Sequence, residues 1–277
     1  METIVYLGPE GSYTEVATEK IAALYGLNIF KPIIKSSIIK VIEEIDNDNG
    51  FLAVVPIENS IEGIVRETLD NLIKASSRVT IAREVIIPIS HCLISKSDKL
   101  SDITKIMSIP QALAQCQHYI ANTFQNVEIL PTTSTSEAVK SLLDLPENHA
   151  AIGSCNAAEI YNLNILASQI NDVKDNMTRF VCLSADVPLP TGNDKTSIAF
   201  ACHNKPGTLV DALNAFSQNG INLSYIESRP SKKIFGDYNF FIDFDGHIQD
   251  ENIQKTIGKI APIVSFYRFL GSYPKAL

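Results

Sequence analysis

The stretch Asn176-Met177-Thr178-Arg179-Phe180-Val181-Cys182-Leu183 divides the chain into two parts. It places a hydroxyl group, a guanidinium and a ring side by side, just before an apolar run that predicts a β-strand. A proline-rich segment, Val187 to Gly192, follows soon afterwards and predicts a break in the structure. We therefore expect a first domain over residues 1–185, a linker over residues 186–194 and a second domain over residues 195–277.

Length and composition fit two globular domains. The chain has 277 residues, of which 45% are hydrophobic and 19% are charged, so it can form ordinary apolar cores. Its formal net charge of −8 argues against binding to nucleic acid or to an anionic membrane surface. No stretch approaches the roughly 18 apolar residues of a membrane span, and no signal-peptide pattern follows Met1. We expect a soluble, cytoplasmic protein with neither nucleic acid nor membrane as a partner.

The cysteines give no sign of a metal site. Five are scattered along apolar runs, with no CxxC pair. They are Cys92, Cys116, Cys155, Cys182 and Cys202. We therefore expect no bound metal, and buried, reduced thiols in a reducing compartment.

The first domain alternates predicted strands and helices, including one helix over residues 111–124, which is typical of an α/β sheet domain. Ser12, with Glu15 three residues later, forms a capping-box pattern at the start of the first helix. Several strands end in small hydroxyl or amide clusters, where open α/β sheets bind ligands. These clusters are Gly11-Ser12, Asn59-Ser60, Ser108, Ser134-Thr135 and Gly153-Ser154. If they converge with Arg179, they would suit a small molecule that carries carboxylate or phosphate groups, although each is equally typical of a helix cap.

Two further residues have a structural interpretation beside the functional one. Arg179 could bind a carboxylate with two hydrogen bonds, or could pair with Asp175 as a structural bridge. His91 lies between apolar residues, which is more typical of a hydrogen-bonded core histidine than of a catalyst.

The second domain has a different pattern. After the linker, the predicted order is strand, helix, strand, strand, helix, strand in about 75 residues, which is the ferredoxin-like βαββαβ order. A small domain of this kind, attached to a larger one, is typically regulatory or oligomer-forming.

Short motifs in a fixed order cover nearly the whole chain. In the first domain they are Gly8-Pro9-Glu10-Gly11-Ser12-Tyr13-Thr14-Glu15, Pro56-Ile57-Glu58-Asn59-Ser60-Ile61-Glu62-Gly63, Ser108-Ile109-Pro110-Gln111-Ala112-Leu113-Ala114-Gln115-Cys116 and Asn176-Met177-Thr178-Arg179-Phe180. In the second they are Pro206-Gly207-Thr208-Leu209, Glu227-Ser228-Arg229-Pro230 and Leu270-Gly271-Ser272-Tyr273-Pro274. With these motifs the chain resembles the bacterial prephenate dehydratase family with a C-terminal ACT domain. It departs from the family pattern at Ile109, where the family usually has His, at Ser12-Tyr13, usually Thr-Phe, and at Thr208, usually Ala.

The resemblance implies an α/β protein with a two-lobed, periplasmic-binding-protein-like catalytic domain and a ferredoxin-like βαββαβ ACT domain. It implies a lyase without a cofactor, which removes carbon dioxide and water from prephenate and gives phenylpyruvate in phenylalanine biosynthesis. The motifs leave two alternatives open. One is arogenate dehydratase, which catalyses the same reaction on the amino-acid analogue, and the other is a non-catalytic sensor of a small anion or amino acid.

The resemblance also implies site residues. Those matched to catalytic positions are Asn59, Ser108, Gln115 and Thr178, and Thr178 would donate a hydrogen bond or proton to the leaving hydroxyl. Those matched to substrate-binding positions are Glu58, Ser60, Arg179 and Phe180, although Phe180 equally fits a core residue.

The ACT domain implies a second, regulatory ligand. Its matched effector-binding residues are Asn204, Pro206, Gly207, Thr208, Leu209, Glu227, Ser228, Arg229 and Pro230. The implied effector is phenylalanine, bound at a subunit interface of a homodimer or homotetramer. A glycine turn that opens a helix offers backbone N–H groups to a carboxylate, and Glu227 could meet the ammonium group.

Overall fold

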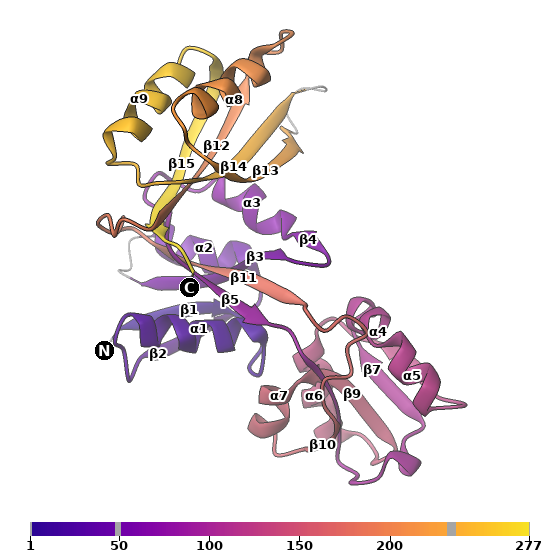
Figure 1. Ribbon diagram of the computed structural model, residues 1–277. Helices are drawn as coiled ribbons and strands as arrows, with labels where there is room; N and C mark the ends of the chain where they lie inside the picture. The colour runs from indigo at the N-terminus through magenta and orange to yellow at the C-terminus, as the bar shows by residue number, and fades with distance from the viewer. Residues whose placement is uncertain (1, 48–50, 232–236, 277) are drawn as a thin grey trace.

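The computed structural model describes residues 2–47, 51–231 and 237–276, and these residues form three sheets (Figure 1). The first has the strand order β2-β1-β3-β11-β5, with β4 paired to β3. The second has the order β10-β6-β9-β7-β8, and the third has the order β13-β14-β12-β15. The first two sheets form two lobes of the N-terminal part of the chain, and the third forms a separate C-terminal domain.

Lobe 1 alternates strands and helices as the sequence predicts. Its elements are β1 (Thr3–Leu7), α1 (Tyr13–Leu24), β2 (Lys31–Lys35), α2 (Ile38–Asp46), β3 (Leu52–Asn59), β4 (Gly63–Ile64), α3 (Arg66–Leu72) and β5 (Thr80–Pro88). The predicted start of α1 is confirmed, because Ser12 Oγ accepts a hydrogen bond from the Glu15 backbone N–H at 3.3 Å. The Glu15 carboxylate accepts from Gly11 N–H at 2.6 Å, one residue before the cap.

Lobe 2 contains the second sheet and small helices. Its elements are β6 (His91–Ser95), β7 (Lys105–Ser108), α4 (Pro110–Gln115), α5 (Gln117–Thr123), β8 (Glu128–Pro131), α6 (Thr135–Ser141), β9 (His149–Ser154), α7 (Cys155–Ile160) and β10 (Asn164–Ala167), with short 3-10 turns at Leu100–Asp102 and Leu142–Asp144. The single helix predicted over residues 111–124 is wrong. Two helices meet at Cys116, whose φ of −120° and ψ of 16° are not helical.

A disulfide joins Cys92 to Cys155 in lobe 2. The expectation of buried, reduced thiols is therefore wrong for this pair. It holds for Cys116 and Cys182, whereas Cys202 is a free thiol that is only partly buried. The pairing brings together β6 and the first residue of α7, which lie 63 residues apart in the chain. Such a distant pair cannot be recognised from cysteine spacing alone.

The chain crosses between the lobes twice. It enters lobe 2 between β5 and β6 and returns through residues 168–176 to β11 (Met177–Ser184), which lies antiparallel between β3 and β5. Because β1, β2 and β3 are parallel, all three end at the edge where β11 begins. This polar edge of the first sheet is turned toward lobe 2 (Figure 1).

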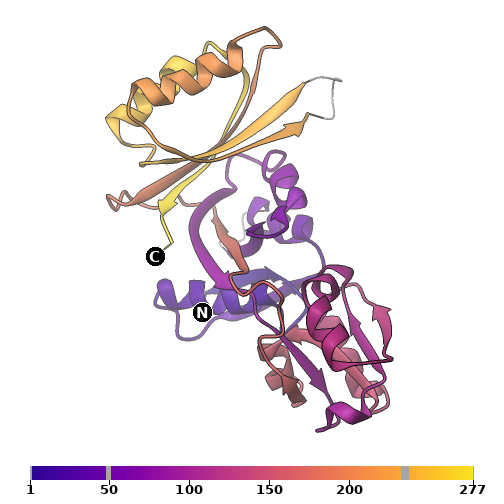
Figure 2. The ribbon, with the colours of Figure 1, turned by 45° about the vertical axis from the view of Figure 1, so that its right-hand side comes forward.

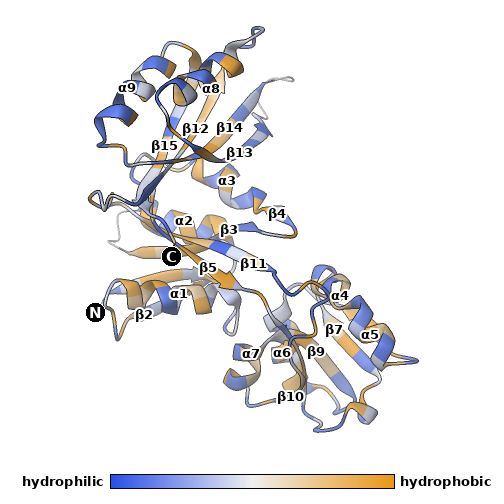
Figure 3. Ribbon diagram, viewed as in Figure 1, coloured by the Kyte–Doolittle hydropathy of each residue, from blue (hydrophilic) through white to orange (hydrophobic). Residues whose placement is uncertain are grey.

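The C-terminal domain has the predicted βαββαβ order. Its elements are β12 (Asp194–Cys202), α8 (Thr208–Gln218), β13 (Leu223–Pro230), β14 (Tyr238–Asp245), α9 (Glu251–Ile260) and β15 (Val264–Pro274). Helices α8 and α9 cover one face of the sheet, and the other face is turned toward lobe 1 (Figure 2). Colouring by hydropathy shows apolar strands inside each body and polar residues on the loops and outer helix faces (Figure 3).

Lobe 1 and the C-terminal domain share an apolar core. Phe241 and Tyr273 of the C-terminal sheet pack in one cluster with Val181 of β11 and other lobe 1 residues. Gly271 of β15, with φ +148°, lies so close to β5 that a Cβ atom there would overlap the backbone of Ile81. The two bodies are therefore packed backbone to backbone at this point.

Candidate active site

Thr178 and Asn59 are neighbours across the antiparallel pair of β11 and β3. Asn59 Nδ2 donates to Thr178 Oγ1 at 2.8 Å. Asn59 Oδ1 accepts from the backbone N–H groups of Ile61 and Glu62, both at 3.0 Å, which fixes the orientation of the amide. Since Thr178 Oγ1 accepts the bond from Asn59, its own proton is available to another acceptor.

Asn176 and Gln115 extend this contact into lobe 2. Asn59 Nδ2 also donates to Asn176 Oδ1 at 2.7 Å, and Asn176 Nδ2 donates to Gln115 Oε1 at 3.1 Å. Gln115 Nε2 in turn donates to Glu62 Oε1 at 3.2 Å. The structure thus brings the predicted residues Asn59, Gln115 and Thr178 into one group.

His91 also contacts this group. Its Nε2 lies 3.3 Å from Gln115 Oε1, an oxygen that can only accept, so Nε2 carries the proton. Burial lowers the pKa of His91, and the hydrogen bond to Gln115 partly opposes this shift. His91 Nδ1 is buried and has no hydrogen-bond partner among the described residues.

The sequence predicted no place in the site for Asn176 or Glu62, and it indicated a hydrogen-bonded core position for His91, which is buried and contacts Gln115. Asn176 and Glu62 stand inside the quoted motifs, so their positions were visible although their contacts were not. A lone histidine in an apolar run carries no comparable signal.

The hydroxyl groups of Ser60 and Ser108 have other partners. Ser60 Oγ accepts from Met177 N–H at 2.9 Å and ties the end of β3 to the start of β11. Ser108 is fully buried, and its Oγ donates to the Ile152 carbonyl at 2.7 Å inside lobe 2. The structure does not bring Ser108 into contact with Thr178, so we revise its proposed role from catalysis to support of the second sheet.

Arg179 points away from Thr178, because successive side chains of a strand face opposite sides of the sheet. Its guanidinium lies 2.7 Å from the Asp243 carboxylate of β14, 3.6 Å from that of Glu58 and 3.7 Å from that of Glu84. Burial lowers the pKa of Arg179, but the neighbouring Asp243, Tyr273 and Glu84 raise it by a larger amount. The pKa therefore lies above its ordinary value, and the group stays charged. These contacts place Arg179 and Glu58 at the domain interface, and we withdraw both as substrate anchors.

The pairing of Arg179 with Asp175, which the sequence left open, is replaced by the contact with Asp243. Phe180 is only 3% exposed and packs in the core beside α1, in agreement with the structural interpretation of this residue.

A cavity of about 750 Å³ lies between the lobes. Lobe 1 supplies Leu7, Gly8, Pro9, Ile34, Lys35, Ser36, Ser37, Ile38 and Glu67, and lobe 2 supplies Thr133, Ser134, Glu137 and Lys140. Ser37 is the N-cap of α2, but its Oγ makes no capping bond, is buried and has no hydrogen-bond partner among the described residues. The first-turn N–H groups of α2 thus have no side-chain cap at the cavity.

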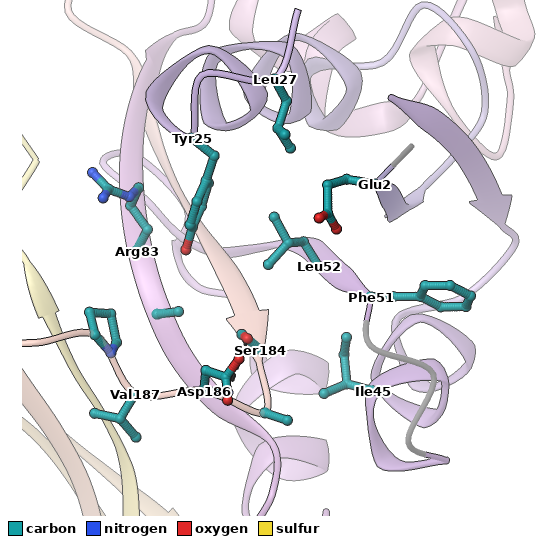
Figure 4. Close-up of a pocket in the computed structure, with 13 residues that line it drawn as sticks. Glu2, Tyr25, Leu27, Ile45, Phe51, Leu52, Arg83, Ser184, Asp186 and Val187 are labelled. Carbon is teal, nitrogen blue, oxygen red and sulfur yellow. Dashed lines mark hydrogen bonds between the residues drawn. The ribbon is translucent and has the colours of Figure 1, made fainter. Parts of the chain in front are cut away.

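A second pocket lies on another side of lobe 1 (Figure 4). The guanidinium of Arg83 stands over the ring of Tyr25, 5.0 Å from its centroid, and linker residues Asp186 and Val187 close one side. Only lobe 1 and the segment that follows β11 line this pocket, and it does not open between the lobes, so we assign it no part in the reaction.

The two predicted effector motifs lie in different places. A pocket of about 160 Å³ beside α8 is lined by Asn204, Thr208 and Leu209 of the first motif, together with residues of β14, and none of its lining residues belongs to β13. Gly207, with φ +87°, is the N-cap of α8. In the second motif, Arg229 of β13 pairs with Asp70 of α3 at 3.2 Å, so its side chain meets lobe 1.

Both parts of the chain match models of known protein families. The family model for prephenate dehydratase matches residues 4–188, and the model for the ACT domain matches residues 196–262. The chain belongs to the prephenate dehydratase family. It is 40% identical over 277 residues to the prephenate dehydratase of Methanocaldococcus jannaschii, covering 99% of this chain and 98% of that one.

Two further members of the family are similar over nearly the whole chain. A bifunctional chorismate mutase/prephenate dehydratase of Aquifex aeolicus is 40% identical over 275 residues, which are 99% of this chain and 74% of that protein. The crystal structure of the Arthrobacter aurescens prephenate dehydratase in complex with L-Phe superposes with a TM-score of 0.89 at 34% identity, covering 99% of this chain and 90% of that one.

Two absences hold for the described residues only. No group of three or more His, Cys, Asp or Glu side chains in them could hold a metal ion. None of their helices is long and apolar enough to cross a membrane.

Proposed function

We propose that the chain converts prephenate to phenylpyruvate, carbon dioxide and water, and that Thr178 assists the departure of the hydroxyl group. The observation that carries this role is the bond from Asn59 Nδ2 to Thr178 Oγ1, which leaves the threonine proton for the substrate. Family membership and the hydrogen bonds that connect Thr178, through Asn59 and Asn176, to Gln115 of lobe 2 support the same function.

Asn59 makes Thr178 a better donor. As the carbon–carbon bond to the ring carboxylate breaks, its electron pair enters the ring and the C4 hydroxyl leaves with the bonding electrons. The departing oxygen takes a proton, so one proton from solvent is consumed in forming water. A hydrogen bond from Thr178 stabilises the negative charge on that oxygen, and the Asn59 amide stabilises the charge that builds up on Thr178 Oγ1.

With Arg179 at the domain interface, other groups must orient the substrate carboxylates. The cavity between the lobes offers the uncapped start of α2 at Ser37, together with Lys35 and Lys140. Lys35 is also paired with Glu44 at 2.5 Å, so Lys140 is the less neutralised cation of the two. We assign the carboxylate of the side chain, which is not lost, to this region.

Regulation by phenylalanine forms a second part of the proposal. The L-Phe complex of the Arthrobacter aurescens relative supports phenylalanine as the effector. Three of the predicted effector residues, Asn204, Thr208 and Leu209, line a small pocket. We place the complete site between ACT domains of a homodimer or homotetramer, in a cytoplasmic enzyme.

Phenylpyruvate formation by the purified chain tests the function. Prephenate is supplied with and without phenylalanine, product is read by its absorbance in alkali, and the uncatalysed rate is subtracted. Turnover of prephenate that phenylalanine changes supports both parts. Turnover without any response to phenylalanine removes the regulatory part. Turnover of arogenate but not of prephenate would identify the protein as an arogenate dehydratase. Binding of either compound without turnover would indicate a non-catalytic sensor.

A further inference from the structure

Four hydrogen bonds form a closed ring beside Thr178. The Glu62 backbone N–H donates to Asn59 Oδ1, Asn59 Nδ2 to Asn176 Oδ1, Asn176 Nδ2 to Gln115 Oε1, and Gln115 Nε2 to Glu62 Oε1. All four bonds run in the same direction around the ring. Their direction is fixed at Glu62, because its backbone N–H can only donate and its carboxylate oxygen accepts from Gln115.

The ring joins separate parts of the catalytic domain. Asn59 and Glu62 belong to lobe 1, Gln115 ends helix α4 of lobe 2, and Asn176 lies on the segment that crosses between the lobes. Asn176 is 1% exposed, so a lost partner there would leave a buried polar atom unpaired. The one branch out of the ring toward the reaction is the bond from Asn59 to Thr178.

We propose that Asn176 and Glu62 are positioning residues, which hold the Asn59 amide toward Thr178 most firmly while Gln115 of lobe 2 is in contact with lobe 1. Thr178 is then a fully oriented donor when the lobes are closed on each other. When Gln115 withdraws, Asn176 loses its acceptor and is held less firmly itself. Asn59 then depends mainly on contacts within lobe 1, such as those from the Ile61 and Glu62 backbone N–H groups. This inference rests on the proposed role of Thr178 and adds the reason why donation is tied to lobe contact.

The substitution Asn176→Asp tests the direction of the ring. The new carboxylate still accepts from Asn59, but it cannot donate to Gln115 Oε1 unless it is protonated. We expect kcat to fall about 10- to 100-fold at pH 8, with a smaller change in KM. Burial and the nearby Glu62 raise the pKa of the new carboxyl above its ordinary value of about 3.9, so kcat should rise again as the pH is lowered toward 6.

A matched control is Asn171→Asp. Asn171 lies on the same crossing segment and accepts from His91 N–H at 2.6 Å, but it has no bond to the ring. Its kcat should show no recovery at low pH. The titratable neighbours Glu62 and His91 are present in the wild type as well, so the wild-type profile separates their contribution.

A charge exchange tests the contact between the lobes, even if Asn176→Asp does not fold. Gln115→Glu alone places a second carboxylate at hydrogen-bond distance from Glu62 and should lower kcat about 10-fold or more. In the double variant Gln115→Glu with Glu62→Gln, the new amide at position 62 can donate to the new carboxylate at position 115. This variant should recover most of the lost kcat.

The outcomes separate this inference from the function on which it rests. If the wild-type protein does not turn over prephenate, the proposed function itself is refuted. If the wild type is active and the Asn176→Asp variant has the same kcat and the same pH profile, the proposed role of the hydrogen-bonded ring is refuted. A charge-exchanged pair no more active than Gln115→Glu alone overturns the contact between the lobes.

Discussion

Arg179 and Asp243 form a 2.7 Å ion pair that joins β11 of lobe 1 to β14 of the ACT domain. The next residue back along β11 is Thr178, whose side chain faces the other side of the sheet. One strand therefore contains both the proposed hydrogen-bond donor of the reaction and a buried charged contact between the domains. A change in the ACT sheet that moves Asp243 acts directly on the backbone beside Thr178.

Loss of the ion pair should weaken regulation. In Asp243→Asn, the neutral amide no longer balances the Arg179 charge, although its oxygen can still accept a bond. We expect a loss of about 1–3 kcal/mol in the free energy of unfolding, because both side chains are nearly buried. Inhibition by phenylalanine should need a higher concentration, while turnover without phenylalanine changes less. These effects are measured by urea unfolding and by inhibition curves, and an unchanged inhibition curve would contradict the link.

Removal of the Thr178 hydroxyl should abolish most of the activity. Thr178→Val keeps the shape of the side chain but cannot donate, so we expect kcat to fall roughly 10²–10⁴-fold. Thr178→Ser keeps the hydroxyl and should retain much more activity at a similar Tm. Near-normal turnover by the valine variant would remove Thr178 from the mechanism.

Lys140 should contribute to binding more than to chemistry. Lys140→Ala removes a cation from the cavity between the lobes, and we expect KM to rise about 5-fold with little change in kcat. The difference from wild type should shrink at high salt, since exposed charges are screened. Lys255→Ala, which removes an exposed lysine of the ACT domain, is the control. Equal KM values for both variants would exclude Lys140 as an anchor.

His91 should make stability depend on pH. Burial lowers the pKa of His91 in the folded state below its ordinary value of about 6.5. The unfolded chain therefore binds more protons as the pH falls below about 6.5, and folding stability is lost between that pH and the lower folded pKa. His91→Gln should flatten this part of a plot of unfolding free energy against pH. A slope that is the same in the variant and the wild type would assign the dependence to other groups.

The order and type of most elements could be predicted from hydrophobic periodicity, but the contacts of the site could not. The apolar run Val181-Cys182-Leu183 predicts a strand, and the observed strand begins earlier, at Met177. Within that strand the period of two places Thr178 and Arg179 on opposite sides. Grouping them in one site neglected this rule. The contact of Asn59 with Asn176 joins residues 117 positions apart and depends on strand order and register, which a single sequence does not reveal. The break at Cys116 was missed because the apolar spacing continues through it.

The close approach of β15 to β5, which Gly271 permits, also determines how the molecule can move. Lobe 1 and the ACT domain share an apolar core, so any swing between them would have to expose packed side chains to water. Lobe 2 is attached by two chain crossings and by hydrogen bonds such as that from Ser154 Oγ to the Gly11 carbonyl at 2.6 Å. Lobe 1 and the ACT domain are therefore expected to move as one rigid body, and lobe 2 is the part that can move relative to it. Separation of the two lobes would break these polar contacts and the close approach of Gly11 to Ala157, and would leave the core shared with the ACT domain intact.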